Sequence, residues 1–159
     1  MDVKVAKTAG FCFGVKRAVE EVYKVAETTK GAVYTYGPII HNEEVVSDLE
    51  KKGVKVLETE EALKNLTEGT VIIRSHGVPK YIYELLEERN IAYVDVTCPF
   101  VLKIHRIVER ESKQGRHIII IGDPKHPEVV GIKGWCQGKA TIIKTKEDAK
   151  HFLGESGEK

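Results

Sequence analysis

The most constraining feature of this sequence is an internal repeat. The segment Ala9-Gly-Phe-Cys12 is matched by Asp95-Val-Thr-Cys98, 86 positions later. Gly37-Pro-Ile-Ile-His41 is matched in the same way by Gly122-Asp-Pro-Lys-His126, and these histidines are 85 positions apart. Two matched pairs at nearly one offset indicate that a single structural unit occurs twice. The unit has a cysteine where a strand passes into a helix, then a Gly-to-His loop before a second helix.

Strand and helix patterns alternate along the whole chain. Strands are expected at residues 3–7, 32–35, 54–57, 71–73, 91–96 and 117–121, and helices at 15–27, 42–52, 60–66, 79–89, 100–113 and from 127 onward. Alternation with short connections predicts an α/β fold with mostly parallel sheets. The repeat divides it into small parallel-sheet modules, a complete one over residues 1–97 and a truncated one over residues 98–159. The loop Arg74-Ser-His76-Gly77 ends the third strand of the first module, and its counterpart would fall near position 162, beyond the last residue.

Composition excludes several classes of partner. The 25 basic and 24 acidic residues give a net charge of +1 without a basic run, so nucleic acid is not expected. No apolar stretch approaches the ~20 residues that cross a bilayer, and residues 1–9 contain no hydrophobic signal core. An odd count of three cysteines is no disulfide framework. We therefore expect a cytoplasmic protein in which some of the cysteines bind metal or take part in catalysis.

Cys12 and Cys98 are the candidate metal ligands. Cys12 lies between Gly10 and Gly14, and glycines let the main chain approach a bulky inorganic group. Cys98 precedes a proline, as cysteines that ligate iron–sulfur clusters do in some proteins. A free cysteine is often only a small buried apolar residue, and we favour that interpretation for Cys136, which lacks the repeat position.

Three histidines are candidate anion ligands. His41, His76 and His126 each precede a helix, beside glycine or proline. Free N–H groups at a helix N-terminus favour anions, and an imidazole there adds hydrogen bonds to the same anion. With the reference histidine pKa of ~6.5, binding should be tighter near pH 6 than near pH 8. His105 and His117 lack this placement, as does His151, and are taken as structural.

Glu128 lies in the first turn of the helix that Pro127 begins, where an acidic residue ordinarily complements the helix dipole. A negatively charged partner would instead raise its pKa and make it a proton donor. Arg74 and Lys16 could contact a substrate, although exposed roles are equally compatible with their positions. The sequence has no Walker loop and no GxGxxG motif, so common nucleotide binding has no support.

Five motifs in one order resemble a known family. They are Ala9-Gly-Phe-Cys-Phe-Gly-Val-Lys-Arg17, Gly37-Pro-Ile-Ile-His-Asn42, Ile73-Arg-Ser-His-Gly77, Val96-Thr-Cys-Pro99 and His126-Pro-Glu128. Together they are similar to 4-hydroxy-3-methylbut-2-enyl diphosphate reductase, from residue 3 to about residue 150. That family has three α/β modules around a central [4Fe–4S] cluster, with one cysteine from each module and one iron open to substrate. The resemblance implies that the third module is missing here and that the strand at residues 3–7 pairs with it.

The resemblance also implies an activity and the residues that carry it. The activity is reductive removal of the allylic hydroxyl of the diphosphate substrate, which gives isopentenyl and dimethylallyl diphosphate in the non-mevalonate isoprenoid pathway. An external electron donor such as ferredoxin or flavodoxin would supply two electrons. Cys12 and Cys98 would ligate the cluster, while His41, His76 and His126 would bind the diphosphate. Glu128 would give the proton to the departing hydroxyl. With the third cysteine absent, this chain alone is expected to be inactive and to hold the cluster poorly.

Two alternatives stay open at this point. Two thiolates and several imidazoles also suit Zn²⁺, although the cysteines lack the close pairing of most zinc sites. A non-catalytic anion-binding α/β module would use the same three histidines without a cluster. Analysis of bound metal, sulfide and phosphate in purified protein separates these alternatives from an iron–sulfur reductase.

Overall fold

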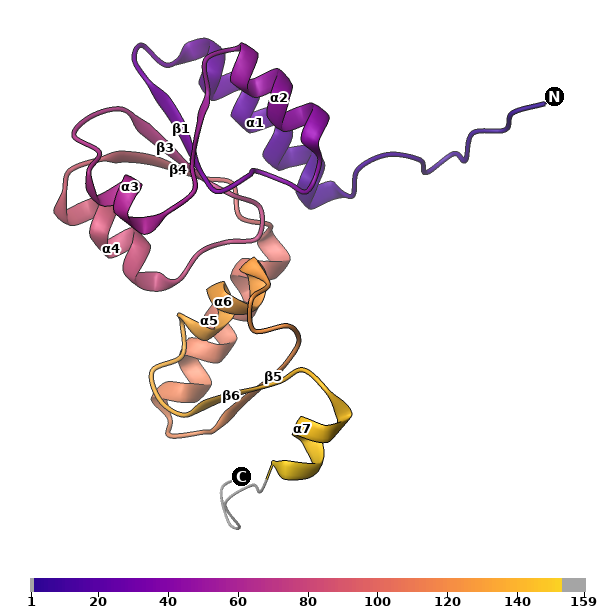
Figure 1. Ribbon diagram of the computed structural model, residues 1–159, viewed down its shortest axis with the longest axis vertical. Coiled ribbons are helices and arrows are strands. Elements are labelled where there is room, and N and C mark those ends of the chain that lie inside the picture. Colours follow the sequence, from indigo (N-terminus) through magenta and orange to yellow (C-terminus); the bar gives the residue numbers. More distant parts are fainter. Residues whose placement is uncertain (1, 153–159) are drawn as a thin grey trace.

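Residues 2–152, which the computed structural model describes, form two parallel β-sheets with helices packed against them (Figure 1). The order along the chain is α1 (Phe13–Thr28), β1 (Val33–Tyr36), α2 (Glu43–Lys51), β2 (Lys55–Leu57), α3 (Glu60–Lys64), β3 (Thr70–Ile73), α4 (Lys80–Glu88), β4 (Ala92–Asp95), α5 (Pro99–Lys113), β5 (Ile118–Ile121), α6 (Pro127–Lys133), β6 (Ala140–Ile143) and α7 (Lys146–His151). The predicted α/β class with parallel strands is confirmed. We call the first sheet with α1–α4 the first unit, and the second sheet with α5–α7 the second unit.

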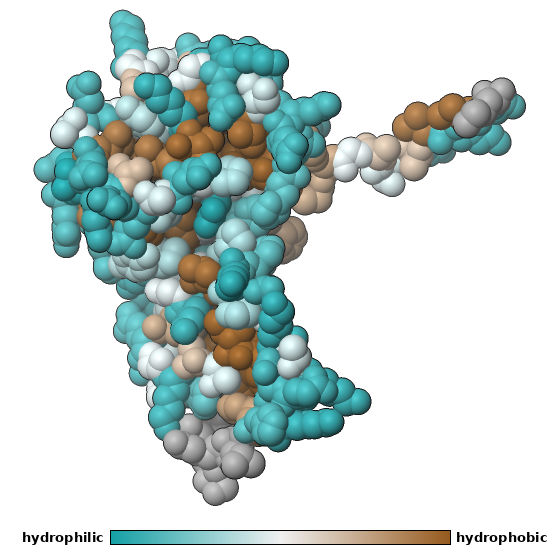
Figure 2. All heavy atoms as spheres, viewed as in Figure 1, coloured by the Kyte–Doolittle hydropathy of each residue, from teal (hydrophilic) through white to brown (hydrophobic). Residues whose placement is uncertain are grey.

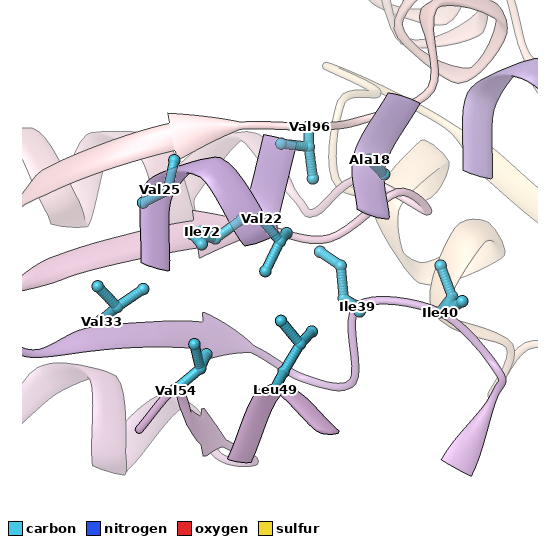
Figure 3. Packing of buried hydrophobic residues seen from close by; sticks show 10 residues of the cluster. All are labelled: Ala18, Val22, Val25, Val33, Ile39, Ile40, Leu49, Val54, Ile72 and Val96. Atoms are coloured by element: carbon cyan, nitrogen blue, oxygen red, sulfur yellow. The ribbon is translucent and has the colours of Figure 1, made fainter. Parts of the chain in front are cut away.

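The first sheet has the strand order β2-β1-β3-β4 and is covered on both faces. Successive residues of a strand point to opposite faces, so Ile72 packs on one side while Val71 and Ile73 pack on the other. On the Ile72 side, α1 contributes Val22 and α2 contributes Leu49 (Figure 3). Val71, Ile72 and Ile73 are all fully buried, so β3 lies at the centre of the first unit.

The opposite face of the first sheet is covered by α3 and α4. Leu63 of α3 packs with Ile82 and Leu86 of α4 against β3. Apolar residues four apart, as Ile82 and Leu86 are, lie on one face of a helix, which is why α4 docks along that side. The first unit is thus a three-layer sandwich of helices, sheet and helices.

The second unit repeats this plan on a smaller scale. Its sheet pairs β5 with β6, and one apolar cluster of Val108, Ile120, Val129 and Ile132 joins that sheet to α5 and α6. The register preserves the offset seen in the sequence. Tyr34 pairs with Lys55 in the first sheet, and Ile119 pairs with Thr141 in the second, 85 and 86 positions further on. The structure therefore contains the repeat that the cysteine and histidine spacing indicates.

Neither β6 nor α7 was expected from the sequence. The apolar run of β6 is short, and α7 begins with a capping box in which Thr145 and Asp148 satisfy each other's backbone N–H groups. A Thr followed three residues later by an acidic residue is a known helix-start pattern, so this signal was present in the sequence.

The strand expected at residues 3–7 is wrong for the described chain. This segment projects from the body of the first unit (Figures 1 and 2) and forms no strand. Val3 and Val5 are 80% and 79% exposed. An apolar–polar alternation favours a strand only where another strand supplies hydrogen bonds, and no described strand lies beside this one. Among residues 2–152 there is also no helix that is both long and apolar enough to cross a membrane.

Candidate functional site

Three loops of the first unit meet where its strands end. They follow β1, β3 and β4, and hydrogen bonds join them in that order. The hydroxyl of Ser75 donates to the carbonyl of Ile39 at 3.0 Å, and the N–H of Cys98 donates to the carbonyl of Ser75 at 2.9 Å. Ser75 is itself buried. The carboxyl ends of parallel strands are where α/β proteins bind ligands, and here that edge is a connected framework.

This framework brings the three predicted histidines together. The ring centroids of His41 and His76 are 4.6 Å apart, and those of His41 and His126 are 6.0 Å apart. The His76 and His126 rings lie edge to face at 5.9 Å. His126 comes from the second unit, as the N-cap of α6, so the imidazole cluster (His41, His76 and His126) spans both units.

His76 is the most enclosed member of the imidazole cluster. Its Nδ1 atom is buried without a hydrogen-bond partner in the described chain. Burial is the main cause that lowers its pKa to about 4, and the nearby His41, Arg74 and His126 act in the same direction. Without a ligand, His76 is therefore neutral near pH 6.5, and the expected pH dependence of anion binding stays a prediction. A neutral, unpaired imidazole in a positive environment is suited to bind an anion, because the anion would offset both causes of the shift.

Arg74 adds a cation beside this cluster. Its guanidinium lies so close to Gly37 that a Cβ at position 37 would collide with Nη1. Gly37 also has a φ of +71°, so glycine serves both the turn and this close approach. Burial lowers the pKa of Arg74, and its Nε atom has no partner among residues 2–152. Lys16, by contrast, is exposed and pairs with Glu20 at 3.8 Å.

The two predicted cysteines occupy equivalent positions. Cys12 is the N-cap of α1 and Cys98 is the N-cap of α5, and neither side chain makes a capping hydrogen bond. The start of α1 also approaches Cys98, because a Cβ added to Gly14 would lie 2.6 Å from the sulfur of Cys98. The glycine two residues after Cys12 thus leaves room for the second thiol. Two cysteine sulfurs at helix N-termini are suited to ligate one metal-containing group.

Cys136 lies elsewhere, as expected from the sequence. Its thiol donates to the carbonyl of Ile132 at 3.6 Å and packs on the core of the second unit. Burial raises the pKa of this thiol, which disfavours the thiolate that binds metals. Across residues 2–152, no group of three or more His, Cys, Asp or Glu side chains is arranged to hold a metal ion. The zinc alternative therefore has no ligand set in the described chain.

Glu128 lies beside the imidazole cluster in sequence and in space. Its backbone N–H donates to Nδ1 of His126 at 3.3 Å, within the first turn of α6. The residue is half-buried. The backbone of Glu128 thus lies next to His126, in the first turn of α6.

One buried residue of the junction was missed. His105 is 1% exposed and stacks on Trp135, with ring centroids 5.2 Å apart and an interplanar angle of 18°. The local sequence around His105 does not distinguish it from any other residue on the buried side of a helix. The residues that it contacts are far from it in the sequence, so no local pattern could identify them.

Known proteins resemble this chain over most of its length. Residues 3–157 match the family described as LytB protein. A 4-hydroxy-3-methylbut-2-enyl diphosphate reductase of Caldanaerobacter subterraneus subsp. tengcongensis is 51% identical over 96% of this chain and 53% of its own length. The relative of the same name from Clostridioides difficile is 46% identical, over 96% and 54%. The chain spans about half the length of the curated relatives it matches.

Solved structures agree with these relatives. One, described as (E)-4-hydroxy-3-methyl-but-2-enyl diphosphate reductase, the terminal enzyme of the non-mevalonate pathway, superposes with a TM-score of 0.79 at 40% identity, covering 94% of this chain and 53% of that one. The E-1-hydroxy-2-methyl-but-2-enyl-4-diphosphate reductase of Plasmodium falciparum gives 0.88 at 29% identity, covering 96% and 48%.

Proposed function

Because this chain belongs to the LytB protein family, we propose that it supplies the diphosphate-binding part of a reductase of isoprenoid precursor synthesis. The reaction proposed for the whole enzyme is the two-electron removal of the allylic hydroxyl of 4-hydroxy-3-methylbut-2-enyl diphosphate as water. The relatives' names support this reaction class. Since the chain spans about half of their length, we expect it to bind diphosphate without reducing the substrate by itself.

The convergence of three imidazoles carries the proposal. At the carboxyl edge of the first sheet, His41 and His76 contact each other, and His126 reaches them from the second unit. Each neutral ring can donate one hydrogen bond, and a ring that gains a proton on binding donates two and adds a positive charge. Arg74 strengthens the local positive potential. A diphosphate, with several acceptor oxygens and high negative charge, fits this set of donors.

Titration of purified protein with inorganic pyrophosphate tests the proposal. His76→Ala should weaken binding at least tenfold, because hydrogen bonds to charged groups contribute roughly 1.5–3 kcal/mol. His151→Ala is the matched control, since His151 is exposed and lies on α7, outside the imidazole cluster. Equal affinities for the parent and both variants would refute the site.

Cys12 and Cys98 are proposed to hold an iron–sulfur cluster in the complete enzyme. The space that Gly14 leaves beside the Cys98 sulfur and the two uncapped helix N-termini fit thiolate ligands of such a group. When bound, the cluster would pass on to the substrate the electrons that an external donor supplies. Two cysteines are fewer than a cluster needs, so we expect this chain alone to hold the cluster poorly. Cluster content after anaerobic reconstitution tests this, since a stable stoichiometric [4Fe–4S] centre on this chain alone would contradict it.

Glu128 is proposed as the proton donor to the departing hydroxyl. Its support is its position, half-buried beside His126 at the start of α6. In the complete reductase, Glu128→Gln should lower turnover by ~10²–10⁴-fold while substrate binding is retained. Turnover within a few-fold of the parent would return Glu128 to an ordinary role at a helix N-terminus. The external electron donor and the cytoplasmic location expected from the sequence stay predictions.

A further inference from the structure

A buried imidazole lies where the two units meet. His105, on α5, is fully enclosed, and neither of its ring nitrogens has a hydrogen-bond partner in the described chain. An unpaired polar group in the interior costs roughly 1–3 kcal/mol relative to an apolar group of the same shape. An apolar residue at this position would give greater stability, so stability alone does not account for a histidine here.

The ring lies against two of the segments that carry the candidate site. A Cβ added to Gly77 would lie 2.6 Å from its Cε1 atom, and one added to Gly131 would lie 3.5 Å from its Nε2 atom. Gly77 directly follows His76, and Gly131 is on the helix whose N-cap is His126. His105 itself is on the helix whose N-cap is Cys98. Glycines on both sides therefore let the ring fill the gap between the two units.

Two further hydrogen bonds join the two units close to this ring. The indole N–H of Trp135 donates to the carbonyl of Val78 at 2.9 Å, and the N–H of Lys80 donates to the carbonyl of Gly134 at 3.4 Å. Trp135 stacks on His105. The hydrogen bonds draw the end of α6 toward the loop after β3, and the ring limits how closely they can approach. Together they fix the separation between His76 and His126.

We propose that His105 is a positioning residue for the imidazole cluster, and that its ring sets the distance between the first-unit histidines and His126. The flat imidazole stacks on Trp135, and its close approach to Gly77 leaves no room for a side chain at position 77. His105 acts through its neighbours and does not contact the ligand. The inference rests on the proposed function only for its binding readout, because its geometric readout needs no ligand.

The geometric test measures contacts between histidine rings by NMR in the ligand-free protein. Ring protons of His41 and His76 should show cross-relaxation, as should those of His76 and His126. His105→Ala should abolish the second contact, which crosses the junction, and keep the first, which lies within the first unit. His105→Gln, which is similar in size and flat at its end, should keep both. Persistence of the His76–His126 contact in His105→Ala would overturn the proposal.

Pyrophosphate affinity gives the functional readout. His105→Ala should bind about tenfold more weakly, the factor that corresponds to losing one hydrogen bond to a charged group, and His105→Gln should recover most of this loss. Leu86→Ala is the control for stability, because Leu86 is 1% exposed in the core of the first unit. If Leu86→Ala weakened binding equally, the effect of His105 would be general destabilisation and the proposal would fail. If the parent did not bind pyrophosphate, the proposed function would fail, and the ring contacts would still decide the role of His105.

Discussion

The two units share one plan but differ in how completely it is built. In the first, β1 has a partner on each edge, and in the second, β5 pairs with β6 alone among the described strands. Tyr34 and Tyr36 of β1 are packed against the α3 and α4 side of their sheet. Their counterparts 85 positions later, Ile119 and Ile121, are 47% and 83% exposed. The same strand is therefore a central element in one unit and a half-covered one in the other.

The two units also differ in how they hold the histidines of the candidate site. The loops of the first unit are joined by buried hydrogen bonds through Ser75, so His41 and His76 are held by a framework of their own. His126 is the N-cap of α6, which packs on the second unit's core of four buried residues. Its place depends on contacts with the first unit at Trp135 and His105. The site thus has one half held by hydrogen bonds within the first unit and a second half held by contacts between the units.

The largest expected effect compares matched core substitutions. Ile72→Ala removes a fully buried side chain from a central strand of the first sheet, which has an apolar core on each face. We therefore expect the free energy of unfolding to fall by about 4 kcal/mol. Ile120→Ala, in the smaller core of the second unit, should cost about 2 kcal/mol because that core can relax more easily.

Urea denaturation measures both values, and hydrogen exchange locates them. The amides of β5 and β6 should open at a lower free energy than those of β3. Equal costs for the two substitutions, or slower exchange in the second sheet, would show that the units are equally well built.

A smaller effect concerns acid and the junction. Burial lowers the pKa of His105 to about 4 from a reference value of 6.5, although Asp95 opposes this. The unfolded chain therefore binds a proton near pH 6.5, while the folded chain does not until about pH 4. This contribution to stability is complete above pH 6.5 and is lost as the pH falls toward 4, by roughly 2 kcal/mol between pH 7 and pH 5. His76 should contribute in the same direction.

Unfolding at pH 7 and pH 5 isolates the His105 part when the parent is compared with His105→Gln. The variant should lose less stability on acidification because its side chain does not titrate. An identical loss in both proteins would place the acid sensitivity elsewhere.

Most of the candidate site could be predicted from the sequence. Cys12 and Cys98 could be matched through the repeat, and His41, His76 and His126 could be singled out by their positions between strand and helix, where α/β proteins bind ligands. The strand at residues 3–7 could not be judged from its alternating pattern, because a strand requires a neighbour that the pattern does not name. The role of His105 was hidden for a similar reason, since Gly77 and Trp135 are 28 and 30 positions away from it.

The central claim is that one anion site is assembled from both units. Its most direct test is to follow the ring resonances of all the histidines while pyrophosphate is added. We expect His41, His76 and His126 to shift together with one dissociation constant, while His117 and His151, which lie outside the imidazole cluster, stay unchanged. Shifts confined to His41 and His76, or no shift of any of the three, would contradict the claim.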